Sequence, residues 1–340
     1  MKAATHTRYG TPDVLTVTDV PAPDAGPGQI KVRVHASSVT RGDLRLRAAD
    51  YPGLGWLLGR MVSGLLHPRH AVPGTNFAGQ VVAVGEGVTL FAVGDDVFGT
   101  CDHGACAEYL VVREDGVVTQ MPEGVSYVEA AATPYGGLTA QKFMHQLARV
   151  KPGEQVLIIG AAGGVGRFAV QMACHLGAEV TAVCRGRDAE QVRALGAVEI
   201  IDYTTTSFTQ SGMRYDVVFD ASGTAGFWRC RSVLTAQGRY LTLWLSMVVL
   251  LQMLGTKLWG RGRRALFSVA LGSQIEMKDL AVLLGQRVIW PVVGEVLPLS
   301  QITEAHRLAS SGGGCVVVTT GSTSSGAAPT LRATTRYAFP

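Results

Sequence analysis

The clearest chemical pattern in the sequence is the run GAAGGVG, which spans Gly160 to Gly166. The apolar run VLII precedes it, and RFAVQMACHLGA, a segment of helical character, follows it. In such a turn the first glycine leaves a strand tightly, the second lets a pyrophosphate approach the backbone, and the third allows close helix packing. The helix N-terminus then offers free N–H groups and partial positive charge to the phosphates. The residues expected to hold a dinucleotide are Gly160, Gly163, Gly164, Val165 and Gly166.

A second strand is predicted at Glu179–Cys184, which favours a dinucleotide site over a purely structural glycine turn. An NAD site places a carboxylate at the end of this strand, where it binds the ribose 2′-hydroxyl. Here Arg185 and Arg187 follow the strand, and guanidinium groups can bind a 2′-phosphate in a bidentate manner. The alternatives are that both arginines are solvated loop charges and that Asp188 serves NAD. Because Asp188 lies past the strand end, we predict NADPH as the cofactor.

Two different patterns of predicted secondary structure indicate two domains of an α/β protein. Over residues 1–125, short β-type runs broken by Gly and Pro, such as Gln29–Ser38, predict a mostly antiparallel, barrel-like domain. Over residues 126–286, apolar strands alternate with helical segments, the pattern of a doubly wound parallel sheet. The pattern of short strands returns over 287–320, so the chain is expected to rejoin its first domain. Residues 321–340 are rich in Gly, Ser, Thr, Ala and Pro and predict a disordered tail.

Composition excludes several classes of function. The 340 residues are 47% hydrophobic and 16% charged, and the formal net charge of +4 is too small for a nucleic-acid-binding protein. The six cysteines show no paired spacing, and the N-terminal residues lack the apolar run of a signal peptide, so we expect reduced thiols and a cytoplasmic location. The apolar run Leu241–Trp259 contains Gln252, Gly255 and Lys257, which favours a buried strand followed by an apolar helix over a membrane span.

Blocks along almost the whole chain resemble the medium-chain dehydrogenase/reductases. Within them the sequence is most similar to the zinc-free quinone oxidoreductases, and in particular to the reticulon-interacting-protein-like members. The longest block runs from Val150 to Tyr203, and others are VRVHASSVTRGDLRLR, PGTNFAGQVVAVGEGVTLFAVGDDVFG and AAATPYGGLTA, so the resemblance covers roughly residues 1–320. It implies a GroES-like, mostly-β catalytic domain plus a Rossmann domain. It also implies NADPH-dependent reduction of quinones or of the C=C bond of α,β-unsaturated carbonyl compounds.

Zinc-dependent members of this family hold their catalytic metal through a Cys and a His-Glu pair. This chain has Thr40 at the position of the Cys, and Thr75 and Asn76 at the positions of the pair. Hydroxyl and amide groups do not make a closed zinc site. The four clustered cysteines of the structural zinc lobe are absent from the sequence too. We therefore predict no metal, which disfavours zinc-dependent alcohol oxidation.

The resemblance also implies which residues serve catalysis, namely Thr40 and Asp43. It places Thr40 beside the nicotinamide, where many quinone reductases carry Asn, and a hydroxyl there can donate to a developing oxyanion. Packing of the cleft is the alternative role for Thr40. Asp43 matches a recurring aspartate that positions the loop, and the Tyr that often follows it in quinone reductases is absent. The remaining cofactor contacts that the resemblance implies are Arg41, Thr139, Tyr203 and Ser222.

Two apolar stretches, Tyr51–His67 and Ser246–Trp259, bear on substrate and assembly. Such stretches suit the walls of a cleft for a lipophilic quinone or enone, a dimer interface, or contact with a membrane surface. We expect a homodimer. Two competing functions remain: a non-catalytic NADPH-binding protein, which the missing Tyr keeps open, and a biosynthetic enoyl reductase acting on a specialised intermediate.

Overall fold

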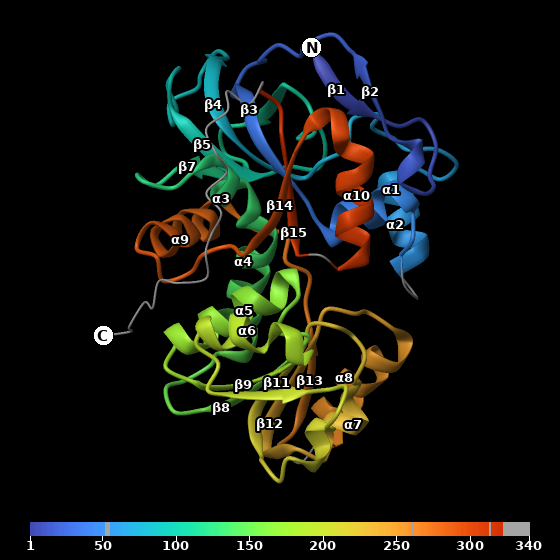
Figure 1. The fold of residues 1–340 in the computed structure, drawn as a ribbon, viewed down its shortest axis with the longest axis vertical. Coiled ribbons are helices and arrows are strands. Elements are labelled where there is room, and N and C mark those ends of the chain that lie inside the picture. The colour runs from blue at the N-terminus through green and yellow to red at the C-terminus, as the bar shows by residue number, and fades with distance from the viewer. Residues whose placement is uncertain (52–54, 260–261, 313, 322–340) are drawn as a thin grey trace.

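The computed structural model describes residues 1–51, 55–259, 262–312 and 314–321. The predicted tail, apart from Gly321, lies outside the described residues. Two large sheets organise the described part of the chain (Figure 1), one of six strands and one of seven. A small third sheet pairs β1 (Lys2–Thr5) with β2 (Thr16–Asp19) in antiparallel fashion.

All strand pairs of the six-stranded sheet are parallel, in the order β10-β9-β8-β11-β12-β13. Its strands are β8 (Gln155–Ile159), β9 (Glu179–Cys184), β10 (Glu199–Asp202), β11 (Tyr215–Asp220), β12 (Leu234–Thr242) and β13 (Arg264–Phe267). Counted from β8, this is the order 3-2-1-4-5-6 of a Rossmann fold, which confirms the predicted doubly wound sheet. The apolar residues of β8 are all buried because helices cover both faces of such a sheet.

Helices cover both faces of the parallel sheet. In Figure 1, α5 and α6 lie on one face, and α7 and α8 lie on the other. The helices that follow the first β-rich segment are α3 (Tyr127–Ala132), α4 (Pro134–Gln141), η2 (Lys142–Ala148), α5 (Gly164–His175), η3 (Gly186–Asp188), α6 (Ala189–Ala194), η4 (Phe208–Gln210), α7 (Phe227–Arg231), α8 (Met247–Trp259) and α9 (Gln274–Gly285). The rings of Phe143 and Phe219 lie 5.0 Å apart in the core beneath the sheet.

The seven-stranded sheet has the order β14-β15-β3-β4-β5-β7, with β6 also paired to β3. Its strands are β3 (Gln29–Val39), β4 (Asn76–Val84), β5 (Asp96–Thr100), β6 (Tyr109–Arg113), β7 (Val118–Gln120), β14 (Val293–Pro298) and β15 (Cys315–Thr319). Only the pair β14–β15 is parallel, so the predicted mostly-β, GroES-like domain is confirmed. Strand β15 comes from the far end of the chain and pairs antiparallel with β3, with Val316 opposite Val39. The helices beside this sheet are η1 (Pro12–Val14), α1 (Arg41–Ala48), α2 (Gly55–Ser63), η5 (Leu299–Gln301) and α10 (Ile302–Ser311).

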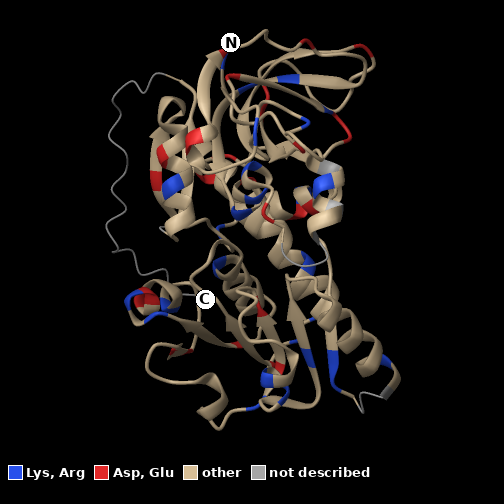
Figure 2. Cartoon of the chain, turned by 90° about the vertical axis from the view of Figure 1, so that its right-hand side faces the viewer, with Lys and Arg blue, Asp and Glu red and all other residues tan. Residues whose placement is uncertain are grey.

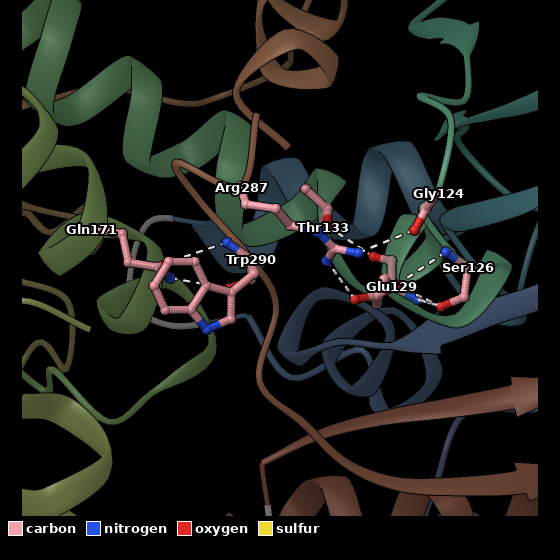
Figure 3. A network of polar contacts seen from close by, with 7 residues as sticks. All are labelled: Gly124, Ser126, Glu129, Thr133, Gln171, Arg287 and Trp290. Atoms are coloured by element: carbon pink, nitrogen blue, oxygen red, sulfur yellow. Dashed lines mark hydrogen bonds and ion pairs between the residues drawn. The ribbon is translucent and has the colours of Figure 1, made fainter. Parts of the chain in front are cut away.

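The segment that leads from α9 back to the seven-stranded sheet is fixed by side-chain contacts (Figure 3). The Gln171 side chain of α5 accepts a hydrogen bond from Trp290 N at 2.9 Å and donates one to Trp290 O at 3.0 Å. Arg287 donates to Glu129 Oε1 at 2.6 Å and to the carbonyl of Gly124 at 3.1 Å. Polar contacts of this kind hold the two large sheets in a fixed relation, and the cavity described below depends on that relation.

The apolar run near residue 250 forms a strand and then a helix, as expected. Strand β12 is buried at its C-terminal end, and α8 follows it. Within the part of the chain that the structure describes, no helix has the length and apolar character needed to cross a membrane. Helix α8 nevertheless leaves large apolar side chains exposed, among them Leu251 and Leu254.

Candidate active site

A cavity of about 1400 Å³ is lined by residues of both large sheets and of the helices beside them. It brings together residues that lie far apart in the sequence. Of the site residues predicted from the sequence, those that line it are Thr40, Arg41, Thr139, Gly160, Gly163, Gly164, Val165, Gly166, Arg185, Arg187, Tyr203 and Ser222. Asp43 is the exception, because it is buried behind Thr40 and does not reach the cavity.

The glycine turn between β8 and α5 has the backbone that its sequence predicts. Gly160 has a φ of +81°, in the left-handed region that favours glycine. A Cβ on Gly166 would lie 2.1 Å from the Gly160 carbonyl oxygen, so no side chain fits at that position. Gly163 is the N-cap of α5 and no side chain caps the helix there. The first N–H groups of α5 therefore point into the cavity without helical partners and can bind an anion.

Two cationic side chains follow the end of β9, which ends at Cys184. Arg185 Nε donates a hydrogen bond of 2.6 Å to the Tyr203 hydroxyl, which holds the guanidinium beside the end of β10. Arg187 is exposed, and its Nε lies 4.0 Å from Asp188 Oδ1 in the short helix η3. The strand end thus presents guanidinium groups, and the next carboxylate in the sequence, Asp188, is already beside a cation. Asp202, the last residue of β10, is a second carboxylate at this edge and lies against Gly186.

The loop after β11 is organised by Asp220, a residue that the sequence analysis did not single out. Its fully buried carboxylate accepts hydrogen bonds from Ser222 Oγ at 2.8 Å, Gly223 N at 2.7 Å and Ala225 N at 2.9 Å. These contacts fix the loop at the point where β8 and β11 are neighbours and the strand order reverses, the place where this fold binds ligands. The available signal was the position of Asp220 directly after the apolar run VVF.

Thr40 and Asp43 form a capping box at the start of α1. Asp43 Oδ2 accepts from Thr40 N at 2.8 Å and from Thr40 Oγ1 at 2.5 Å, while Asp43 N donates to Thr40 Oγ1 at 3.3 Å. The other carboxylate oxygen accepts from Thr75 Oγ1 at 2.9 Å. Burial raises the pKa of the Asp43 carboxyl, against the opposing effect of these hydrogen bonds. The carboxyl thus caps the start of α1, and its burial favours the protonated form.

The protonation state of Asp43 decides what the Thr40 hydroxyl can do. When Asp43 is ionised, the single hydroxyl proton of Thr40 points at the carboxylate, and Thr40 can only accept a hydrogen bond from the cavity. When Asp43 is protonated it can donate to Thr40 Oγ1, and Thr40 is then free to donate into the cavity. A donor role for Thr40 therefore requires a proton on Asp43.

The three positions that hold zinc in metal-dependent relatives do not fit a metal here. Thr40 and Thr75 both use their hydroxyl groups on Asp43, and Asn76 Nδ2 donates to Thr75 Oγ1 at 3.1 Å. Neutral hydroxyl and amide groups engaged with one another lack the thiolate, imidazole or carboxylate donors that zinc prefers. Among the described residues no group of three His, Cys, Asp or Glu side chains is placed to hold a metal ion.

Two cationic residues that line the cavity, Arg45 and Arg167, were not found from the sequence. The Arg45 guanidinium lies 4.3 Å from the ring centre of Trp244, so this pair joins α1 to the loop after β12 across the cavity. Arg167, in the first turn of α5, is buried and lines the cavity close to the glycine turn.

Two of the predicted cofactor contacts occupy helices beside the cavity. The Thr139 hydroxyl donates a hydrogen bond to Tyr135 O at 2.6 Å within α4, so its proton is engaged by the helix backbone. Arg41 lines the cavity as the first residue of α1.

Comparison with known proteins agrees with this architecture. The family model described as the alcohol dehydrogenase GroES-like domain matches residues 26–123, and the model described as zinc-binding dehydrogenase matches residues 195–315. A chloroplastic quinone-oxidoreductase homolog of Spinacia oleracea is 37% identical over 239 residues, which cover 66% of this chain and 69% of the relative. The chain belongs to the medium-chain dehydrogenase/reductase superfamily, in its quinone-oxidoreductase-like group.

Two further comparisons extend this family assignment over the chain. The mitochondrial NAD(P)H oxidoreductase RTN4IP1 of Mus musculus is 30% identical over 315 residues, 82% of this chain and 78% of the relative. The structure of the quinone oxidoreductase from Coxiella burnetii superposes with a TM-score of 0.81 at 27% identity and covers 94% of this chain and 99% of its own. The protein is therefore an NAD(P)H-dependent oxidoreductase of this superfamily, and the predicted resemblance is confirmed.

Proposed function

We propose that this protein uses NADPH to reduce quinones or the C=C bond of α,β-unsaturated carbonyl compounds without a catalytic zinc. The observation that carries the proposal is that one cavity joins the glycine turn of β8 and α5 to Thr40, a hydroxyl backed by the buried carboxyl of Asp43. When bound, the nicotinamide supplies the hydride. Quinones and enones share a conjugated carbonyl whose oxygen gains negative charge as hydride arrives, so both need the same hydrogen-bond donor.

Support for NADPH over NADH comes from the end of β9. The last residue of β9 is Cys184, so the strand itself does not end in the carboxylate that would bind a ribose 2′-hydroxyl and repel a 2′-phosphate. Arg185 is held there by Tyr203, and Arg187 lies nearby on the exposed rim. A side-by-side titration with NADPH and NADH tests this part, and equal dissociation constants would refute it.

The proton needed to complete the reduction is assigned to the pair Thr40 and Asp43. Thr40 Oγ1 would donate its proton to the acceptor oxygen and take the proton held on Asp43 Oδ2, so Asp43 ends ionised and the product oxygen neutral. The ionised carboxylate keeps three donors, Thr40 N, Thr40 Oγ1 and Thr75 Oγ1, which stabilise its charge until it is protonated again. Thr40 is thus the residue that touches the acceptor, and Asp43 acts through it.

The decisive experiment follows NADPH oxidation against a panel of quinones, 2-alkenals and cyclic enones, with the protein pretreated with a chelator. Turnover that survives chelation supports a zinc-free reductase, and loss of turnover that added Zn²⁺ restores would contradict it. Saturable NADPH binding without turnover across the panel would favour a non-catalytic NADPH-binding protein. Turnover restricted to a tethered or specialised enoyl substrate would favour the biosynthetic reductase instead.

We also propose a homodimer and a cytoplasmic location. All six cysteines are free thiols, which suits a reducing compartment. Light scattering that gives the mass of one chain at working concentrations would refute the dimer.

A further inference from the structure

Helix α8 presents its apolar residues outward. Five of them, each more than half exposed, form one stripe that we call the α8 apolar face: Met247, Val248, Leu251, Leu254 and Leu258. At about 100° per residue these positions fall within roughly one third of the helix circumference. The residue of α8 that is buried is Gln252, at 9% exposure, and its side-chain oxygen has no hydrogen-bond partner among the described residues.

An outward stripe of this kind is the reverse of what a surface helix shows when water is its only neighbour. Surface apolar residues are ordinary when scattered singly, but a contiguous stripe marks a surface that contacts something apolar. The adjoining side of the molecule has the same character. Trp56, Leu57 and Met61 of α2 are also more than half exposed, and α2 and α8 lie on the same side of the molecule in Figures 1 and 2.

The chain segment that contains the α8 apolar face carries charges of one sign only. From residue 221 to residue 275 the sequence contains seven Lys and Arg residues and no Asp or Glu. Lys257 and Arg264 are exposed, and neither makes an ion pair within the described ranges. They lie close together in the fold, because Thr256 Oγ1 accepts a hydrogen bond from Ala265 N at 3.1 Å. In Figure 2, α8, the helix at the lower right, carries no red segment.

This charge pattern decides between the possible occupants of the face. A second copy placed by a two-fold axis would set the same cationic surface against itself, which costs energy. A bilayer with anionic headgroups is complementary to both parts of the surface, since leucines enter the headgroup boundary while cations contact the lipid charge. We propose that α8 docks this protein on an anionic lipid membrane through the α8 apolar face, Lys257 and Arg264.

Segments that flank the docking surface in the sequence line the cavity. Trp244, three residues before α8, and Ala270, three residues after β13, both line the cavity. On the other side Ala48 and Asp50 line it, just before α2. Docking itself does not depend on the proposed reduction, because it is measured without any acceptor.

Co-sedimentation with vesicles of phosphatidylcholine alone and of phosphatidylcholine with phosphatidylserine tests the proposal on the full chain. The expected result is binding to the phosphatidylserine vesicles only, weakened by high salt. Leu251→Gln/Leu254→Gln should lower the partition coefficient at least about tenfold, because two buried leucines are lost from the contact. Lys257→Gln/Arg264→Gln should remove the dependence on phosphatidylserine.

Leu90→Gln/Val93→Gln is the matched control, since both residues are exposed apolar side chains far from α8 in the sequence. This control should bind vesicles within about twofold of the unchanged protein. Retained NADPH binding shows that each variant is folded. Failure of the unchanged protein to bind phosphatidylserine vesicles would overturn the proposal. So would a leucine variant that binds them normally, or one that turns a dimer into a monomer without changing vesicle binding, which would assign the face to a second copy.

Discussion

Thr40 Oγ1 and Asp43 Oδ2 lie 2.5 Å apart, inside a capping box that is buried from solvent yet opens onto the cavity through Thr40 alone. The two residues that cap helix α1 are therefore also the proposed proton donor and the residue that supplies its proton. A change that disturbs the cap disturbs the donor, so substitutions at the two positions must be compared for activity and for stability separately.

Replacing Thr40 tests its role as donor. We expect Thr40→Val to lower kcat for an enone or quinone by roughly 10²-fold, because one donor to the developing oxyanion is lost. Thr40→Ser keeps the hydroxyl and should stay within about tenfold of the unchanged enzyme. Steady-state kinetics with both variants make the measurement, and an unchanged kcat in Thr40→Val would leave Thr40 a packing residue.

The Asp43 carboxyl should give the protein a distinct pH dependence of stability. Its pKa is raised in the folded state by burial, so the folded protein binds the proton more tightly than the unfolded chain. The contribution of this group to stability is therefore fully present below the unfolded pKa, and it is lost as the pH rises toward the folded pKa. Asp43→Asn removes this titration.

The test is the free energy of unfolding measured by urea denaturation at several pH values between acid and neutral. The difference between Asp43→Asn and the unchanged protein should shift in favour of the variant as the pH rises. Asp115→Asn, at an exposed carboxyl whose pKa is lowered by its hydrogen bond with Arg113, should show the opposite slope. A difference for Asp43→Asn that is independent of pH would contradict the raised pKa.

Removing the two arginines after β9 should change cofactor preference. We expect Arg185→Ala/Arg187→Ala to raise KM for NADPH by at least about tenfold, because charge-assisted contacts to the 2′-phosphate are lost. KM for NADH, which lacks that phosphate, should change by less than about threefold. Arg113→Ala, an exposed arginine paired with Asp115, is the control. An equal rise in KM for both cofactors would contradict a contact between these arginines and the 2′-phosphate.

The glycines of the turn should differ sharply in their tolerance of alanine. Gly166→Ala should destabilise the fold by about 1–3 kcal/mol and weaken cofactor binding, since its Cβ would lie against the Gly160 carbonyl. Gly164→Ala should keep or raise the melting temperature, because no atom lies within 4 Å of its added Cβ and alanine favours a helix. The measurement is thermal unfolding of both variants. Similar melting temperatures would argue against the close approach of position 166 to the Gly160 carbonyl.

Local patterns made much of this fold predictable. Strand β9 has the predicted bounds, and β8 consists of the apolar run VLII with one more residue at its N-terminal end. These strands are short apolar runs with turn residues on either side, so their local sequence determines them. The glycine turn was also predictable, because its conformation depends on the absence of side chains at fixed spacing.

The contacts that complete the site were not predictable from local sequence. Thr75 donates to Asp43 across 32 residues, and Arg45 stacks on Trp244 only after the two sheets have been brought together. Such pairs depend on tertiary packing, which no spacing in one segment records. The α8 apolar face shows the same limit, since an apolar helix is ordinarily predicted to be buried and this one buries Gln252 instead.

The pairing of β15 with β3 has a consequence for the order in which the protein is made. Translation completes the parallel sheet once Phe267 has left the ribosome, and segments then fold as units while synthesis continues. Strand β3, which ends immediately before Thr40, receives its partner β15 only when Thr319 has been added. The dinucleotide turn can therefore form before β15 has been made, whereas the strand that leads into the proposed proton donor gains this neighbour only afterwards.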